Sequence, residues 1–273
     1  PAAYCYSGHP DVERHFYCAG DSNGTAAGNV LEEAILQAFL EIVERDGTAI
    51  WWYNRIARPA VDFASFCVPY LDQVLEHYRN LGRELWALDL TNDLGLPIMA
   101  AVSRRVGGET DDLLIGLGAH LDAQVALLRA VTEVNQFLPA VALDSQGKTN
   151  YAWPDDVAVR FWKEETLDTQ PQLRPDRSVP ARTPADFPNR AAPDLYDNLQ
   201  VCLQTLQRAN MEMLVLDQSR PDIELSVVRV VVPGMRHFWR RLGPGRLYDV
   251  PVQLGWLSRP TPEEKLNPVS VFF

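Results

Sequence analysis

Two glutamates and an arginine near the end of a predicted helix could bind a cation. From Leu31 to Val43, apolar residues recur every three or four positions, a spacing typical of an amphipathic helix. Glu41 lies near the end of this stretch, and Glu44 and Arg45 directly follow it. Because residues three or four positions apart share one face of a helix, Glu41 and Glu44 are expected to point the same way. The alternative is an ordinary surface ion pair between Glu41 and Arg45, since charged clusters on helices often face solvent.

A second predicted helix, from Asp122 to Leu138, carries similar chemistry. Its apolar side is accompanied by Arg129, Glu133 and Gln136, which follow one another at spacings of four and three, so these side chains also share a face. An arginine, a glutamate and a further oxygen ligand on each of two helices favour one shared site over two unrelated ion pairs.

The two helices together offer three carboxylates and one amide oxygen. Oxygen ligands without a suitably placed His or Cys suit Mg²⁺, which makes four residues the expected metal ligands: Glu41, Glu44, Glu133 and Gln136. Three carboxylates would repel a nucleoside triphosphate unless metal ions lay between them. If a triphosphate binds here, we therefore expect more than one Mg²⁺.

Three arginines could supply fixed positive charge to phosphate oxygens: Arg45, Arg129 and Arg229. Arg229 interrupts an otherwise apolar predicted strand, where a charge is costly unless it is paired. The alternative for Arg229 is therefore a buried salt bridge to one of the glutamates.

The glycine-rich run from Ser22 to Asn29, just before the first helix, contains no lysine. The sequence also has no complete Walker motif, no protein-kinase motif set and no GxGxxG in a βαβ unit. Any nucleotide site is therefore not a P-loop.

The remaining pattern predicts an α+β fold of mixed sheets with packed helices. Alternating apolar residues predict strands at 14–18, 84–90, 97–102, 113–117, 213–217 and 225–232. Helical spacing predicts further helices at 71–81 and 194–210. We expect the aromatic run 48–53, after the first helix, to lie in the core. Residues 141–193 are rich in proline and charge, which predicts a long surface loop.

The composition limits the possible partners. A net charge of −11 makes a general nucleic-acid role improbable, because phosphate binding requires a basic surface. No apolar run reaches the length of a membrane span, and no signal peptide is recognisable. The four cysteines form neither a metal-binding spacing nor a disulfide framework, which fits a cytoplasmic protein.

The sequence resembles the YcaO-domain family, and within it the SagD-type component that forms thiazole and oxazole rings in ribosomal peptides. The matching stretches are SNGTAAGNVLEEAILQAFLEIVERDGTAIWWYNRIARP, GRELWALDLTNDLGLPIMAAVSRR, GLGAHLDAQVALLRAVTEVNQFLP, VVRVVVPGMRHFWRRLGPGRLYDVP and the terminal LNP. One departure is Thr25, where the resemblance leads us to expect a cysteine. We expect residues 1–273 to form one YcaO-like catalytic domain, itself a fragment of a longer chain.

In that family, ATP and Mg²⁺ lie between helices that carry an ExxER motif and an ExxQ motif. The resemblance assigns the motifs to Glu41, Glu44 and Arg45 and to Glu133 and Gln136. It implies catalytic roles for Glu44, Arg45 and Arg129. It implies ATP-binding roles for Ser22, Asn23, Glu41, Glu44, Arg45, Arg129, Glu133, Gln136 and Arg229.

A further acidic ligand that some members carry is absent here. Its position is Val141, and Glu164 or Glu165 is the expected replacement.

The resemblance implies ATP-dependent cyclodehydration of Cys, Ser or Thr residues in a ribosomal precursor peptide. The expected partners are that peptide, a leader-binding partner protein or missing N-terminal domain, an FMN-dependent dehydrogenase of the same pathway, and a second copy of the chain in a homodimer. The alternatives are a docking scaffold without chemistry, or another YcaO reaction such as thioamide or amidine formation.

Overall fold

The computed structural model describes residues 20–152 and 157–271, so the strand expected at 14–18 lies outside the described residues. The described residues form two compact units. The first contains those up to Ile42 together with Ala192–Pro233, and the second contains Val43–Ala191 and the residues from Gly234 onward. No helix among the described residues is both long enough and apolar enough to cross a membrane.

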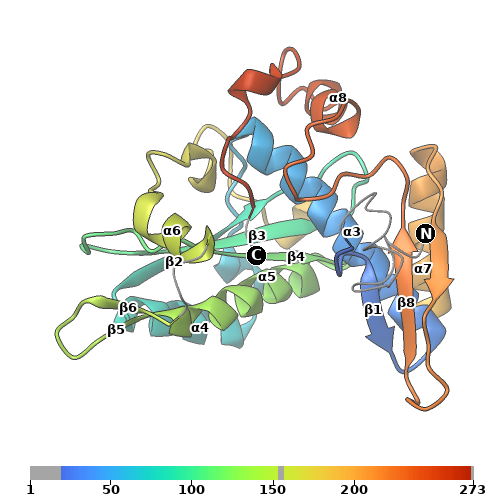
Figure 1. The fold of residues 1–273 in the computed structure, drawn as a ribbon, viewed down its shortest axis with the longest axis horizontal. Helices are drawn as coiled ribbons and strands as arrows, with labels where there is room; N and C mark the ends of the chain where they lie inside the picture. Colours follow the sequence, from blue (N-terminus) through green and yellow to red (C-terminus); the bar gives the residue numbers. More distant parts are fainter. Residues whose placement is uncertain (1–19, 153–156, 272–273) are drawn as a thin grey trace, which may run out of the picture. The chain divides into compact units, whose positions relative to one another are not determined.

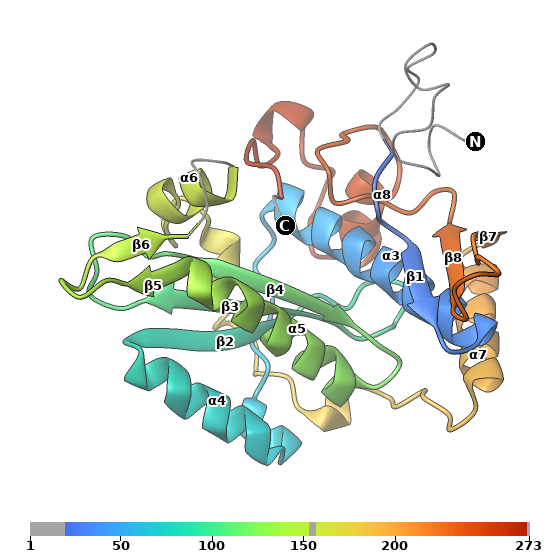
Figure 2. The same ribbon diagram turned by 60° about the horizontal axis from the view of Figure 1, so that its bottom comes forward.

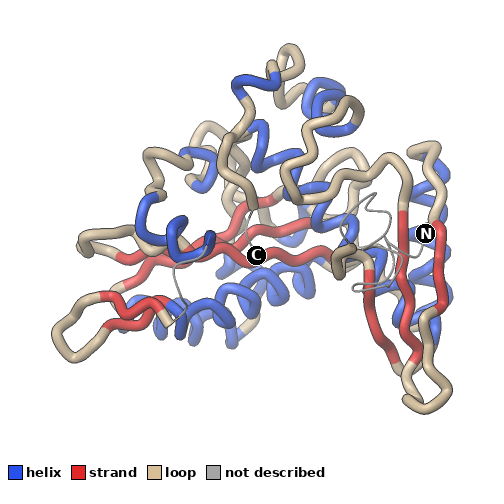
Figure 3. The backbone as a smooth tube through the Cα atoms, in the orientation of Figure 1, coloured by secondary structure: helices blue, strands red, loops and turns tan. Residues whose placement is uncertain are grey.

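The first unit is built on a three-stranded antiparallel sheet (Figures 1 and 3). The strands lie in the order β1 (Thr25–Gly28), β8 (Ser226–Val231) and β7 (Leu214–Asp217). Helix α7 (Leu195–Arg208) belongs to the same unit, and it buries Leu199 and other residues at helical spacing. Strands β7 and β8 and helix α7 match the expected elements within two residues at each end. Strand β1 was not expected, because it lies in the glycine-rich run before the first helix.

The second unit is built on another three-stranded antiparallel sheet, in the order β2 (Arg83–Asp89), β3 (Ile98–Arg105) and β4 (Leu114–Ala119). Helices α4 (Pro69–Asn80) and α5 (Ala123–Phe137) cover one face. The C-terminal half of α3 (Leu31–Asn54) lies on the other face (Figures 1 and 2). Because both faces are covered, β4 is buried along its whole length, which explains its continuous apolar run.

Helix α3 extends eight residues past Asp46. The aromatic run expected after the first helix therefore lies inside it, and its expected place in the core is confirmed. Trp51, Trp52 and Tyr53 are at most 1% exposed. The helix passes through Gly47, where a Cβ atom would lie 2.6 Å from the side chain of Ile98 on β3. A glycine inside a helix costs about 1 kcal/mol relative to alanine. Here it allows the helix to lie close against the sheet.

Residues 141–193 are not one continuous loop. They contain a hairpin of β5 (Val141–Leu143) and β6 (Thr149–Tyr151), and helix α6 (Val157–Glu164). The expectation of one long loop was wrong for these parts. Helix α6 buries Phe161 and Trp162, but it is only eight residues long, which is too short for its apolar spacing to be recognised in the sequence. The rest of the described part of the segment is largely irregular (Figure 3).

The remaining elements are helix α8 (Arg246–Gln253) and short 3₁₀ turns at Phe63–Phe66, Leu138–Ala140, Pro171–Leu173, Pro184–Asp186 and Glu263–Lys265.

Asp46, the residue after the ExxER motif, ties the C-terminal region to α3. Its carboxylate is fully buried. One oxygen accepts from the backbone N–H of Arg236 at 2.7 Å and from Nε of Arg246 at 2.9 Å. The other accepts from Nη2 of Arg246 at 2.7 Å and from the amide of Asn92 at 3.0 Å. This one side chain therefore joins three segments that are far apart in the sequence.

The end of the described chain is anchored on the same helix. Asn267 is fully buried, and its backbone N–H donates to the carbonyl of Tyr53 at 2.8 Å. The indole N–H of Trp52 donates to the carbonyl of Val269 at 2.7 Å. The Leu-Asn-Pro stretch therefore has a structural function at the C-terminal end of α3.

Candidate nucleotide and metal site

The structure divides the expected site residues between the two units. Ser22, Asn23, Glu41 and Arg229 belong to the first unit, and Glu44, Arg45, Arg129, Glu133 and Gln136 belong to the second.

In the first unit, the turn before β1 is held by the first glutamate of α3. The backbone N–H of Gly24 donates to Oε2 of Glu41 at 3.0 Å. Gly24 has φ +75°, and a Cβ there would meet Ile42 at 2.8 Å and the carbonyl oxygen of Val230. Only glycine fits this conformation and this close contact without strain. The turn and Glu41 are therefore positioned by each other.

Arg229 is 2% exposed and is paired across the sheet with Thr25. Its Nη2 lies 3.0 Å from Oδ1 of Asp21, and its Nη1 donates to the Asp21 carbonyl oxygen. Arg229 thus forms a buried ion pair with an aspartate, Asp21, whereas the alternative considered from the sequence was an ion pair with a glutamate. Because Asp21 also accepts from the N–H of Asn23 at 3.0 Å, Arg229 holds the Ser22–Asn23 turn in place.

Asn23 supplies an acceptor that the described residues leave without a donor. The side chain is 8% exposed, and its Oδ1 is buried with no hydrogen-bond partner within the described part of the chain. A buried polar atom without a partner costs about 1–3 kcal/mol. The hydroxyl or amino group of a nucleotide is a suitable donor for it, so this turn fits the expected ligand.

In the second unit, the ExxER and ExxQ helices are within electrostatic reach of each other. Burial lowers the pKa of Arg129 on α5, and the carboxylate of Glu44 on α3 opposes that shift. Arg45 lies beside Glu44, with its Nε 3.8 Å from Oε1 of that residue, and its guanidinium stacks 4.5 Å from the ring centre of Phe238. All three charged side chains are half-buried, where charges interact more strongly than in water.

Two glycines on β4 determine how closely α5 approaches the sheet. A Cβ on Gly118 would lie 2.7 Å from the backbone nitrogen of Ala130 and 2.8 Å from Cβ of Arg129. A Cβ on Gly116 would lie 2.5 Å from the backbone nitrogen of Val134. The close packing lets Glu133 accept a hydrogen bond from the backbone N–H of Leu117 on β4. The GLG sequence thus fixes the height of the ExxQ helix above the sheet.

Replacing Gly118 by Ala should therefore move α5 and weaken nucleotide binding. The new methyl group meets backbone atoms, which cannot rotate away, and overpacking of this kind costs about 1–3 kcal/mol. We expect a lower melting temperature in a thermal unfolding experiment together with weaker Mg²⁺-dependent ATP binding. Gly243→Ala is the control, since no atom lies within 4 Å of its Cβ position. Equal behaviour of the two variants would contradict this function of Gly118.

The remaining expected ligands are less well placed in this structure. Gln136 is exposed. Within residues 20–152 and 157–271, no three His, Cys, Asp or Glu side chains gather as a ready metal site. Glu165 accepts from Thr169 at 2.6 Å and from Gln170 at 2.7 Å, so it stabilises its own turn, and Glu164 is exposed. The metal-ligand set therefore remains a prediction.

Sequence reasoning missed three contributors: Asp21, Gly118 and Phe238. Asp21 directly precedes the Ser22 turn. An acidic residue next to a proposed phosphate site could have been recognised in the sequence as a partner for an arginine. Gly118 lies in an apolar strand, where a glycine marks close approach of another backbone. Nothing in the sequence pattern links Phe238 to Arg45.

Comparisons with known proteins give consistent matches. A family model described as YcaO cyclodehydratase, ATP- and Mg²⁺-binding, matches residues 1–236. A solved heterocyclase in complex with substrate and cofactor is 50% identical with a TM-score of 0.94, covering 100% of this chain and 36% of that one. The heterocyclase TruD is 47% identical with a TM-score of 0.89, covering 100% of this chain and 37% of that one.

A curated relative, an uncharacterized protein of Methanothermobacter thermautotrophicus, is 28% identical over 225 residues, which are 80% of this chain and 56% of the relative. The chain thus spans just over half the length of this relative and just over a third of the two solved heterocyclases.

Proposed function

Because the chain belongs to the YcaO cyclodehydratase family, we propose that it uses ATP and Mg²⁺ to convert Cys, Ser or Thr residues of a ribosomal precursor peptide into azoline rings. The family resemblance inferred from the sequence is confirmed, as is the α+β fold. The family description also names the expected cofactors, ATP and Mg²⁺.

One observation carries the proposal to this chain's own residues. Glu44 of the ExxER motif acts electrostatically on Arg129, which lies one turn before the ExxQ motif on α5. This interaction supports a bound group shared by the two helices. The alternative, a surface ion pair between Glu41 and Arg45 on α3, does not explain why Glu44 lies near Arg129 on α5.

Each residue has a physical function in the proposal. Glu41, Glu44, Glu133 and Gln136 would hold Mg²⁺ through oxygen atoms. Arg45 and Arg129 would donate hydrogen bonds to phosphate oxygens as charge moves during phosphoryl transfer. Oδ1 of Asn23 would accept from the nucleotide, and Arg229 would act on the same turn through Asp21.

The reaction balances as follows. The side-chain sulfur or oxygen of the substrate residue loses its proton and adds to the carbonyl carbon of the preceding amide. The amide nitrogen then loses its proton to leave a C=N bond. The carbonyl oxygen departs as inorganic phosphate, and its loss amounts to one water per ring. Bound ATP supplies the phosphoryl group that makes this oxygen a leaving group.

The proposal extends to the partners of the whole protein. A leader-binding domain or protein would present the precursor peptide, and an FMN-dependent dehydrogenase would oxidise azolines to azoles. A homodimer and a cytoplasmic location complete the proposed setting. The whole of this chain matches 36% of a heterocyclase that was solved with substrate and cofactor. This match supports the proposal that the protein binds a peptide substrate.

The test mixes the chain with ATP, Mg²⁺ and an excess of a synthetic peptide that contains one internal Cys. We expect loss of one water from the peptide by mass spectrometry and release of one phosphate per ring, with neither change for the matched Cys→Ala peptide. Peptide binding without ATP-dependent phosphate release would instead favour the docking scaffold.

A further inference from the structure

Two arginines of the second unit lie directly opposite each other in the sheet. Arg83 on β2 is the cross-strand partner of Arg105 on β3. Arg83 is 2% exposed, and the side chain of Arg105 is 9% exposed. Like charges in this position destabilise a sheet, so the pair needs negative charge nearby.

The nearby carboxylate of Asp112 is fully used. It is 0% exposed and accepts from Arg105 Nε at 2.8 Å, Thr110 at 2.7 Å, Thr149 at 2.7 Å and the Tyr151 hydroxyl at 2.9 Å. These four donors occupy about all the lone-pair sites that a carboxylate offers. One buried negative charge therefore faces two positive ones.

Arg83 gains no carboxylate partner within the described residues. Its Nε donates to the hydroxyl of Ser103 at 2.9 Å, and its Nη2 donates to the backbone carbonyl of Asp112 at 2.5 Å. Its Nη1 is buried with no hydrogen-bond partner in the described part of the chain. Burial and the charge of Arg105 lower the pKa of Arg83 to about 10. A second anion close to the two arginines would offset the excess positive charge.

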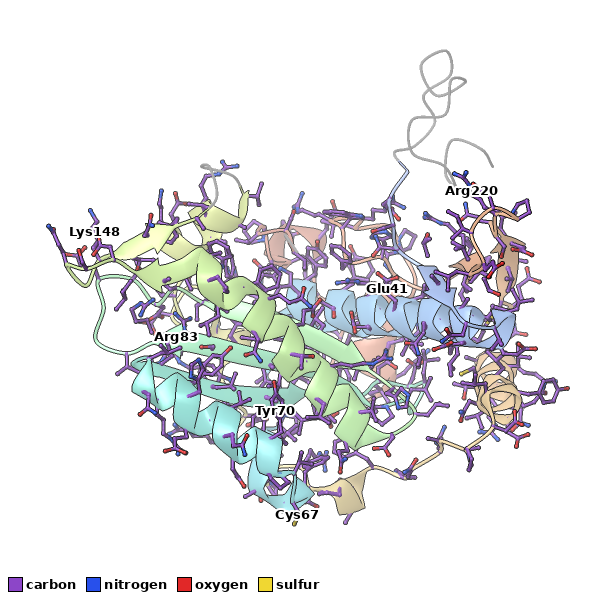
Figure 4. All side chains as sticks on the ribbon, turned by 90° about the horizontal axis from the view of Figure 1, so that it is seen from below. Glu41, Cys67, Tyr70, Arg83, Lys148 and Arg220 are labelled. Atoms are coloured by element: carbon purple, nitrogen blue, oxygen red, sulfur yellow. The ribbon has the colours of Figure 1, made fainter. Side chains whose placement is uncertain are left out.

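A cavity of about 540 Å³ borders both arginines. This volume is within the range of small-molecule sites. Its other walls are mostly apolar and comprise Leu81, Leu138, Pro139, Val141, Ala142 and Leu143, with Asn80 and Asn135 at the polar positions. Figure 4 shows Arg83 beside the C-terminal end of α4 and Lys148 at the tip of hairpin β5–β6. The cavity thus has a cationic end and apolar walls.

We propose that this cavity binds a small amphipathic carboxylate, with the carboxylate beside Arg105 and Arg83 and the apolar part against Leu81, Leu138 and Leu143. Nη2 of Arg105 already donates to the carbonyl oxygen of Val141 at 2.6 Å, so the carboxylate is held by the charge of the two guanidinium groups and by a charge-assisted hydrogen bond from Arg105, which favours an anion over a neutral ligand. The apolar walls favour a ligand with an aromatic or aliphatic body over inorganic phosphate. None of the residues that line the cavity is among the expected ATP-binding residues, although Val141 stands at the position of the family's further acidic ligand. The proposal does not depend on the proposed reaction.

The test uses 3-phenylpropionate as the probe. Its binding to the whole chain is measured by calorimetry or ligand-observed NMR. We expect saturable binding at millimolar concentration, and binding of the uncharged analogue 3-phenylpropanamide that is weaker by about tenfold or more, as loss of a charge-assisted hydrogen bond requires. N-acetylphenylalanine, which resembles the C-terminal residue of a peptide, is the second probe and distinguishes two natural sources of the carboxylate. Tighter binding than the probe indicates the C-terminal residue of a peptide, and weaker binding indicates a free acid.

Leu143→Asp adds a repelling carboxylate at a position that is 46% exposed, so folding should be unaffected. It should weaken binding of 3-phenylpropionate by about tenfold. Leu203→Asp, at a leucine 44% exposed on α7 in the other unit, is the matched control and should change nothing. The proposal is overturned if the probe does not saturate, if the amide binds as well as the acid, or if the two Asp variants bind it equally.

Discussion

Replacing Glu44 by Gln should weaken Mg²⁺-dependent ATP binding by about a hundredfold or more. Loss of an outer-shell partner of a metal typically costs about 10–100-fold in affinity, and a direct oxygen ligand should cost at least as much. The substitution keeps the shape of the side chain and removes the charge that balances Mg²⁺ beside Arg129. Calorimetric titration of ATP in the presence of Mg²⁺ measures the change.

Glu84→Gln is the control for this prediction. Glu84 also forms an ion pair, with Arg104 at 2.7 Å, but its side chain is 53% exposed, and surface pairs contribute only about 0–1 kcal/mol. We expect its ATP affinity to equal that of the wild type. If Glu44→Gln also binds ATP normally, Glu44 does not hold the metal.

Replacing Asp46 by Asn should destabilise the second unit strongly without changing any residue of the proposed ATP site. Breaking a buried ion pair costs about 3–5 kcal/mol, because the remaining charge stays buried without its partner. Here the charge left behind, Arg246, has a side chain that is 13% exposed and keeps its other partner, Asp93, at 2.7 Å, so we expect a cost near the lower end of that range. Each kcal/mol lowers the melting temperature by about 2–4 °C in a chain of this size. Thermal unfolding should therefore show a decrease of about 10 °C.

The matched control is Asp222→Asn. Asp222 pairs with Arg220 at 2.5 Å, but both side chains are more than half exposed, so the expected change is near zero.

Burial lowers the pKa of Arg246, and its hydrogen bonds to Asp46 and Asp93 raise it above its ordinary value by more. The raised pKa of Arg246 contributes stability at every pH below the ordinary pKa of arginine, which lies far above neutral pH. The effect of Asp46→Asn on stability should therefore not vary across neutral pH. A decrease no larger than that of the control would show that Asp46 does not anchor the C-terminal region.

The sequence was sufficient to predict the two helices that carry the candidate site. Apolar residues repeat every three or four positions in α3 and α5, so the faces of Glu44 and Glu133 followed from helix geometry alone. The strands β2, β3 and β4 were also recognisable, because they are apolar and bounded by turns. The family followed from resemblance over nearly the whole chain.

Contacts between distant segments could not be predicted in the same way. The partners of Asp46 lie about 50 and about 200 positions later in the sequence, and periodicity within one element says nothing about them. The Arg83–Arg105 pair depends on the register of β2 and β3, which becomes known only when the sheet is seen. The eight-residue helix α6 was hidden because proline and charge dominate its surroundings.

A double-mutant cycle tests most directly whether α3 and α5 act on the same metal-bound nucleotide. Mg²⁺-dependent ATP binding is measured for the wild type, Glu44→Gln, Glu133→Gln and the variant with both changes. If the two carboxylates hold one cation, removing the first removes the function of the second, so the double variant should bind about as weakly as either single variant. Losses that multiply in the double variant would show that the two glutamates act independently, which contradicts a shared site.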